Sequence, residues 1–265
     1  MKDELGDRIK SNYENRTRIF LPRRTYTIIR IDGKAFHTYT NGLERPFDMG
    51  LIEDMDETAC YLCKNIQGAK FAFVQSDEIS ILLTDFDVIG TDAWFDGNIQ
   101  KIVSVAASMA AAKFNELRLI RRVKDLFMYA GVVTAVLNQK LACFDARTFT
   151  IPSKQEVANA FIWRQQDTVR NSISSVAQTL FSHKELDGKN MSVQQEMIFQ
   201  KGINWNDYAP KLKRGRFIEK ITYSKEFDAN VPFSTSAIRT KWVSNECPTF
   251  TQDKEFLLSR IPDNQ

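Results

Sequence analysis

The sequence predicts an α+β protein with a mostly antiparallel sheet and helices packed on it, in a ferredoxin-like arrangement. Segments rich in β-branched and aromatic residues come in pairs joined by short turns, which is typical of antiparallel strands. Longer segments with apolar residues at helical spacing fall between these pairs. The helices are too few to alternate one for one with the strands, which argues against a doubly wound parallel sheet.

Local signals predict the elements in order. A polar, charge-rich lead-in precedes the first strand and indicates a helix followed by a turn at Pro22. Strands are predicted at residues 25–31, 70–75, 79–84, 127–137 and 141–151. Helices are predicted at residues 48–65, 98–119 and 154–181. Ser153 should cap the last helix, in a capping box with Glu156.

Composition excludes several classes of site. The 265 residues include only 2 histidines, too few for a zinc site with several histidine ligands. Cys60 and Cys63 form a CxxC without a second pair, so we expect buried thiols in a protein of the reducing cytoplasm. No stretch approaches the ~18 apolar residues of a membrane span. The charged start lacks the apolar core of a signal peptide, so we expect no membrane association.

Three carboxylates stand where predicted strands end. Asp32 follows the first strand and precedes Gly33, while Asp77 and Glu78 fill the turn between the next two strands. If these strands are neighbours, the acids meet at one edge and need cations to stay ionised. Carboxylate and carbonyl oxygens suit Mg²⁺, and a pair of such ions would support phosphoryl transfer. The same residue types favour ordinary turns, which leaves a purely structural role open.

Several segments around these acids resemble a known family, in the order in which that family has them. Residues 29–37 read IRIDGKAFH and residues 73–80 read FVQSDEIS. Later runs are FDAR at 144–147, WRQQD at 163–167, KGINWN at 201–206 and KRG at 213–215. Together they make residues 24–218 resemble the tRNA-His guanylyltransferase family.

The resemblance implies a core similar to a polymerase palm and an enzyme that extends RNA in the 3′ to 5′ direction. ATP would activate a 5′-monophosphorylated tRNA, or the tRNA would carry a triphosphate. The 3′-hydroxyl of GTP or another NTP would then attack the 5′ α-phosphate. By resemblance, Asp32, the Gly33 carbonyl and Asp77 would hold two Mg²⁺ ions, and Glu78 would be the third catalytic carboxylate.

The resemblance also assigns residues to substrates. Nucleotide contacts are expected from Lys34, Phe36, His37, Thr40, Arg45, Asp48, Ser76 and Lys101. RNA contacts are expected from Arg164, Asn171, Lys211, Lys213 and Arg214. Basic and aromatic residues alternate between 205 and 220, which suits phosphate contacts and base stacking. A solvated surface is the alternative for these cations.

One departure from the eukaryotic branch narrows the expected activity. Residues 169–172 read VRNS where that branch has His-Ile-Asn-Asn. This difference favours the bacterial-type guanylyltransferase-like branch, whose members repair 5′-truncated tRNA against a template. The alternatives are G addition to tRNA-His, a palm-type nucleotidyl cyclase and a catalytically inactive RNA-binding module.

The domain organisation follows from the extent of the resemblance. Residues 1–220 are expected to form a palm-like catalytic domain with a helical lead-in and a basic hairpin. Residues 221–265 carry no interpretable motif and are expected to be a C-terminal extension. The resemblance also implies a homo-oligomer, specifically a tetramer.

Overall fold

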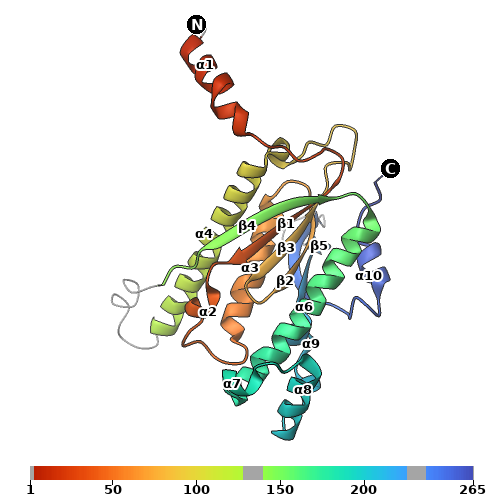
Figure 1. The fold of residues 1–265 in the computed structure, drawn as a ribbon. Coiled ribbons are helices and arrows are strands. Elements are labelled where there is room, and N and C mark those ends of the chain that lie inside the picture. The colour runs from red at the N-terminus through yellow and green to blue at the C-terminus, as the bar shows by residue number, and fades with distance from the viewer. Residues whose placement is uncertain (1–2, 128–139, 226–236, 265) are drawn as a thin grey trace, which may run out of the picture.

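The computed structural model describes residues 3–127, 140–225 and 237–264. Within those ranges the strands form one six-stranded sheet in the order β4-β1-β3-β2-β5-β6, and every neighbouring pair is antiparallel. The expected fold class is therefore confirmed (Figure 1). The strands are β1 (Tyr26–Gly33), β2 (Ala69–Gln75), β3 (Glu78–Leu83), β4 (Phe144–Ile151), β5 (Arg216–Lys225) and β6 (Ala237–Glu246).

Helices cover both faces of the sheet (Figure 1). On one face, α3 and α4 bury Met55 and other apolar side chains against Ile31 of β1. On the other face, α6 and α10 bury Phe161 and Leu257 against Phe217 of β5. The helices are α1 (Glu4–Asn12), η1 (Glu14–Thr17), α2 (Phe36–Tyr39), α3 (Met49–Asn65), η2 (Trp94–Gly97), α4 (Ile99–Phe127), α6 (Lys154–Leu180), α7 (His183–Leu186), α8 (Met191–Gln200), η3 (Trp205–Asp207), α9 (Pro210–Lys213) and α10 (Lys254–Leu258).

Side-chain caps fix where two of the long helices begin. The carboxylate of Asp48 accepts a hydrogen bond from the Leu51 amide at 2.7 Å and starts α3. The hydroxyl of Ser153 accepts from the Glu156 amide at 3.3 Å and starts α6. Half of the predicted capping box is present, because the Glu156 carboxylate accepts from the Asn159 side chain instead.

α4 is longer than predicted, and this corrects a predicted strand. The helix continues to Phe127, the residue at which a strand was expected to begin, and residues 128–137 of that strand lie outside the described residues. Arg118 and Arg121 of α4 donate to the buried carboxylate of Asp54 on α3, at 3.0 and 2.9 Å. These bonds tie the extra turns of α4 to its neighbour.

The CxxC pair lies within α3, and both of its cysteines are free thiols. Burial raises the pKa of Cys60 to about 12 and the pKa of Cys63 well above its ordinary value. Thiols that stay protonated are poor nucleophiles. The prediction of buried thiols agrees with the structure at Cys63, whereas Cys60 is partly exposed.

The N-terminal helix α1 is exposed, whereas the C-terminal helix α10 packs on the sheet and buries Leu257. α1 extends away from the sheet (Figure 1), and none of its residues is buried.

Residues 211–220, expected as a basic hairpin, form the end of α9 and the first half of β5. The boundary expected at residue 220 therefore falls inside a strand, and β6 extends the same sheet.

Candidate active site

The antiparallel register brings the predicted acids together at one edge of the sheet. β1 pairs with β3 so that Asp32 lies opposite Glu78. The amide of Gly33 donates to the carbonyl of Asp77 at 3.1 Å, which ties the end of β1 to the two-residue turn between β2 and β3. Ser76 in that turn has a φ of 43°, a left-handed conformation that tight hairpin turns use.

A fourth carboxylate joins this edge. β4 pairs with the other side of β1 and places Asp145 opposite Asp32. The FDAR run contained this aspartate, but sequence reasoning gave it no role, since the pairing of β4 with β1 was not known. We call Asp32, Asp77, Glu78 and Asp145 the carboxylate edge.

The crowding of carboxylates affects their protonation. Burial, followed by the charge of Asp32, raises the pKa of Asp77 from 3.8 to about 6. Burial and the charges of Glu78 and Asp145 also raise the pKa of Asp32. Both shifts mean that the edge carries negative charge that the protein balances only in part.

Glu78 differs from the other acids because it has a full set of partners. Arg164 donates to both carboxylate oxygens, at 2.8 and 2.7 Å, and Ser80 donates to one of them at 3.1 Å. Arg164 was predicted to contact RNA. In the structure its side chain is only 11% exposed and is bound to both oxygens of Glu78, so it is not part of an exposed basic surface.

Close packing between Gly33 and the Phe36 ring leaves no room for a side chain at position 33. A Cβ atom at position 33 would lie 2.2 Å from the Phe36 ring. That ring is buried and packs against Phe114 and Phe144. Phe36, predicted to contact nucleotide, therefore belongs to the core beneath the carboxylate edge.

The predicted nucleotide-binding residues of the loop after β1 have different positions. Lys34, His37 and Arg45 are exposed. Thr40 donates its hydroxyl to the Phe36 carbonyl at 2.8 Å. The carboxylate of Asp48 is already engaged as the cap of α3.

A cavity of about 110 Å³ gathers residues from both predicted groups next to the turn that carries Asp77. Asp48 and Ser76, predicted to contact nucleotide, line it together with Asn171 and Lys211, predicted to contact RNA. Arg216 also lines this cavity, and its buried Nη2 atom has no hydrogen-bond partner. Sequence reasoning counted Arg216 among basic residues but gave it no site.

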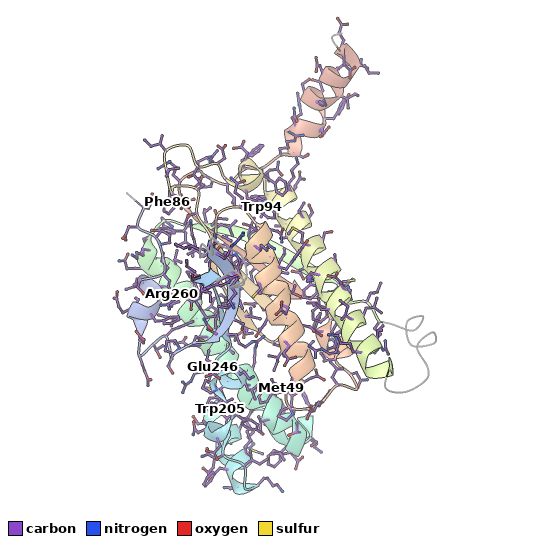
Figure 2. All side chains as sticks on the ribbon, turned by 180° about the vertical axis from the view of Figure 1, so that it is seen from behind. Met49, Phe86, Trp94, Trp205, Glu246 and Arg260 are labelled. Carbon is purple, nitrogen blue, oxygen red and sulfur yellow. The ribbon has the colours of Figure 1, made fainter. Side chains whose placement is uncertain are left out.

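The cavity lies at one end of the molecule and Lys101 at the other. Met49 and Trp205 are at the end that holds the cavity, whereas Trp94, just before α4, is at the opposite end (Figure 2). The amide of Leu21 donates to Gly97, where the chain enters α4. Lys101, whose ammonium lies 5.7 Å from the centre of the Phe95 ring, does not line the cavity, and its contact with nucleotide stays a prediction.

The predicted basic patch, which includes Lys211, Lys213 and Arg214, contains both buried and partly exposed side chains. Lys213 is 6% exposed, and its ammonium donates to the carbonyl of Asn206 at 2.5 Å. Lys213 is therefore not part of the exposed basic surface that the sequence predicts here. Lys211 and Arg214 are partly exposed and remain available to a ligand.

Comparisons with known proteins agree with this geometry. A family model described as tRNAHis guanylyltransferase matches residues 6–152. A bacterial tRNA(His) guanylyltransferase-like protein in complex with ATP is 42% identical, with a TM-score of 0.79 over 97% of this chain and 99% of that chain. A corresponding structure in complex with GTP is 41% identical, with a TM-score of 0.74 and the same coverage.

Curated sequences give the same result. The tRNA(His) guanylyltransferase of Debaryomyces hansenii is 28% identical over 79% of each chain. The likeness to the solved structures also confirms the expected palm-like fold. The family model spans more than half of the residues. The chain therefore belongs to the tRNAHis guanylyltransferase family, a family of nucleotidyltransferases.

Proposed function

We propose that this protein adds NTP-derived nucleotides to the 5′ end of tRNA at the carboxylate edge, with two Mg²⁺ ions. The observation that carries the proposal is the meeting of Asp32, Asp77 and Asp145 at the end of β1, beside a polar cavity. Solved relatives in complex with ATP and with GTP support nucleotides as substrates.

The carboxylate edge fits a hard divalent cation. Its donors are oxygens, and the raised pKa of Asp77 reflects negative charge that a cation would offset. In the described part of the chain, no group of three or more His, Cys, Asp or Glu side chains is arranged so that it could hold a metal ion by itself. Asp32, Asp77 and the Gly33 carbonyl would therefore share an ion with phosphate and water oxygens. When bound, two such ions would activate a hydroxyl and stabilise a leaving oxygen.

The proposed reaction forms one bond and breaks one. The 3′-oxygen of the incoming NTP bonds to the 5′ α-phosphorus of the tRNA and loses its proton to solvent. The bond from that phosphorus to pyrophosphate, or to AMP after activation by ATP, breaks. Exposed Lys34 and Arg45 and the cavity residue Lys211 supply cations suited to the phosphates.

We further propose that the addition is templated and repairs 5′-truncated tRNA. The support is the higher identity to the bacterial guanylyltransferase-like protein, 42%, than to the Debaryomyces enzyme, 28%. The VRNS run at residues 169–172 agrees, since Asn171 lines the cavity without a neighbouring histidine.

We place the protein in the cytoplasm as a homo-oligomer, a tetramer by family resemblance. Apolar side chains on α1 support association, since Leu5 is 62% and Ile9 is 44% exposed. Among the described residues, no helix is long and apolar enough to cross a membrane. Size-exclusion chromatography with light scattering would test the oligomeric state.

The activity can be tested with a labelled tRNA that lacks its first 5′ nucleotide. The purified protein is incubated with Mg²⁺ and each NTP in turn, and the opposing base of the tRNA is varied. Templated repair predicts that the added nucleotide changes with the opposing base. Asp77→Ala, the matched inactive control, should add none.

Other outcomes would separate the alternatives. Addition of G regardless of the opposing base would indicate tRNA-His maturation. A cyclic product from NTP alone would indicate a nucleotidyl cyclase. Binding of tRNA without any product would indicate an inactive RNA-binding module. Comparing 5′-monophosphate with 5′-triphosphate tRNA would show whether ATP activation is required.

A further inference from the structure

A chain of four charged side chains leads from the outer surface of α6 to the carboxylate edge. Arg164 donates from Nε and Nη2 to the two oxygens of Glu78. The same Nη2 donates to Asp167 at 3.0 Å, and Arg170 donates to the other oxygen of Asp167 at 2.7 Å. The side chains of Arg164 and Glu78 are only 11% and 9% exposed, whereas that of Arg170 is 49% exposed.

The surroundings of Arg164 leave it little freedom to contact a substrate. Its guanidinium lies 4.5 Å from the centre of the Trp163 ring, and two carboxylates occupy its Nε and Nη2 donors. A bidentate arginine–carboxylate pair fixes the relative orientation of both groups. Because this pair is buried, separating the two charges would be strongly unfavourable.

Glu78 is placed where its orientation matters for the reacting groups. It lies opposite Asp32 in the β1–β3 register and follows Asp77 directly in the chain. Without Arg164 it would be a further unbalanced carboxylate, free to rotate among the other acids. With Arg164, one of its oxygens accepts two hydrogen bonds and the other accepts one.

We propose that Arg164 is a positioning residue of the nucleotidyl transfer, which holds Glu78 in one orientation so that Asp32 and Asp77 face the substrate without competition. Asp167 and Arg170 keep the guanidinium in place from the outside. The role of Arg164 is thus to act through Glu78 rather than to contact RNA. This inference rests on the function proposed above.

Arg164→Lys tests the inference, because lysine keeps the charge and loses the bidentate geometry. We expect kcat to fall by about 10–100-fold, the usual effect of losing a group that orients a ligand side chain. The KM for NTP and the Kd for tRNA should stay within about twofold of wild type, since nothing that touches substrate has changed.

Arg260→Lys is the matched control. Arg260 also combines a carboxylate partner, Glu219 at 3.0 Å, with an aromatic ring, Phe256 at 3.8 Å, but it lies away from the carboxylate edge. Its kcat should be unchanged. A Kd for tRNA raised tenfold in Arg164→Lys, with kcat unchanged, would overturn the inference in favour of an RNA contact.

Two further measurements guard against loss of folding and against failure of the proposed function. Glu78→Gln combined with Arg164→Gln removes both buried charges, and this double variant should fold yet stay as slow as Arg164→Lys. Full activity in the double variant would mean that the pair serves stability alone. A crystal structure of Arg164→Lys should show the Glu78 carboxylate reoriented, and an unmoved carboxylate would refute positioning even if wild type adds no nucleotides.

Discussion

At the residue scale, the proposed chemistry depends on the acids of the carboxylate edge that have no arginine partner. Glu78 has an arginine partner, whereas Asp32 and Asp77 lie in a half-buried position among other carboxylates. The sequence predicted that these acids would meet, because a two-residue turn and its flanking strands are local features. It did not predict which acid would be paired, because Arg164 lies 86 residues from Glu78.

The raised pKa of Asp77 predicts how stability depends on pH without divalent cations. The pKa is about 6 in the folded state against 3.8 ordinarily, so folding favours the protonated acid. The stabilisation is present below about pH 4 and is lost as pH rises through 6. The loss is on the order of 3 kcal/mol, because the pKa shifts by about two units and one pKa unit corresponds to ~1.4 kcal/mol.

Asp77→Asn removes this titration. Thermal unfolding in EDTA should show the variant gaining stability over wild type as pH rises from 4 to 8. A difference between the two proteins that stays constant across this range would contradict the prediction.

Gly33→Ala should destabilise the protein through one contact. The added Cβ would overlap the Phe36 ring, with a closest distance of 2.2 Å, and overpacking of this kind costs about 1–3 kcal/mol. Denaturant unfolding would measure the loss. Phe36→Leu in the same background should recover part of it, and no recovery would mean that the strain lies elsewhere.

At the element scale, the predicted bounds of α3 and α6 agree with the structure to within one residue, whereas the end of α4 was not predicted. Ser153 caps α6 as its sequence signal predicts, and Asp48, at the expected start of the preceding long helix, proves to cap α3. The end of α4 depends instead on Arg118 and Arg121 reaching Asp54 on another helix. Phe127 was wrongly predicted to begin a strand, since an apolar aromatic residue suits either structure until packing decides.

Asp48 allows its capping role to be separated from its proposed nucleotide contact. Asp48→Ala should lower the free energy of unfolding by about 0.5–2 kcal/mol, because the first turn of α3 loses its acceptor. Asp48→Asn keeps an acceptor and should keep the stability. A raised KM for NTP in Asp48→Asn would indicate a nucleotide contact, whereas an unchanged KM would reduce Asp48 to a cap.

At the scale of the whole molecule, packing against the sheet buries some of the predicted substrate-binding lysines and arginines and leaves others exposed to a ligand. Lys213 and Arg214 are neighbours in sequence, yet Lys213 is buried while Arg214 is partly exposed. Ile102, the neighbour of Lys101 in α4, lines a cavity together with Thr27 near the start of β1, whereas Asp32 lies near the end of that strand. The resemblance therefore predicted Lys101, Lys213 and Arg214 alike as substrate contacts, although they differ in burial and in their place in the fold.

Lys213 and Arg214 form a matched pair for testing RNA binding. Arg214→Gln should weaken tRNA binding and reduce the salt dependence of affinity by about one unit of slope. Lys213→Met should lower the free energy of unfolding by about 1–2 kcal/mol, since it leaves the Asn206 carbonyl without its donor. Filter binding at several salt concentrations, together with thermal unfolding, would separate the two effects. Equal losses of tRNA affinity in both variants would contradict this division.

The sequence by itself determined the family, the antiparallel α+β class and the place of Asp32, Asp77 and Glu78 at strand ends. These features depend on residues close together in the chain and on runs of conventional strand, turn and helix signals. Only the tertiary structure decided that Asp145 joins the acids, that Arg164 and Lys213 are buried, and that Lys101 stands apart. Those outcomes depend on which distant elements pack together, because burial and ion pairing are properties of the assembled sheet and its covering helices.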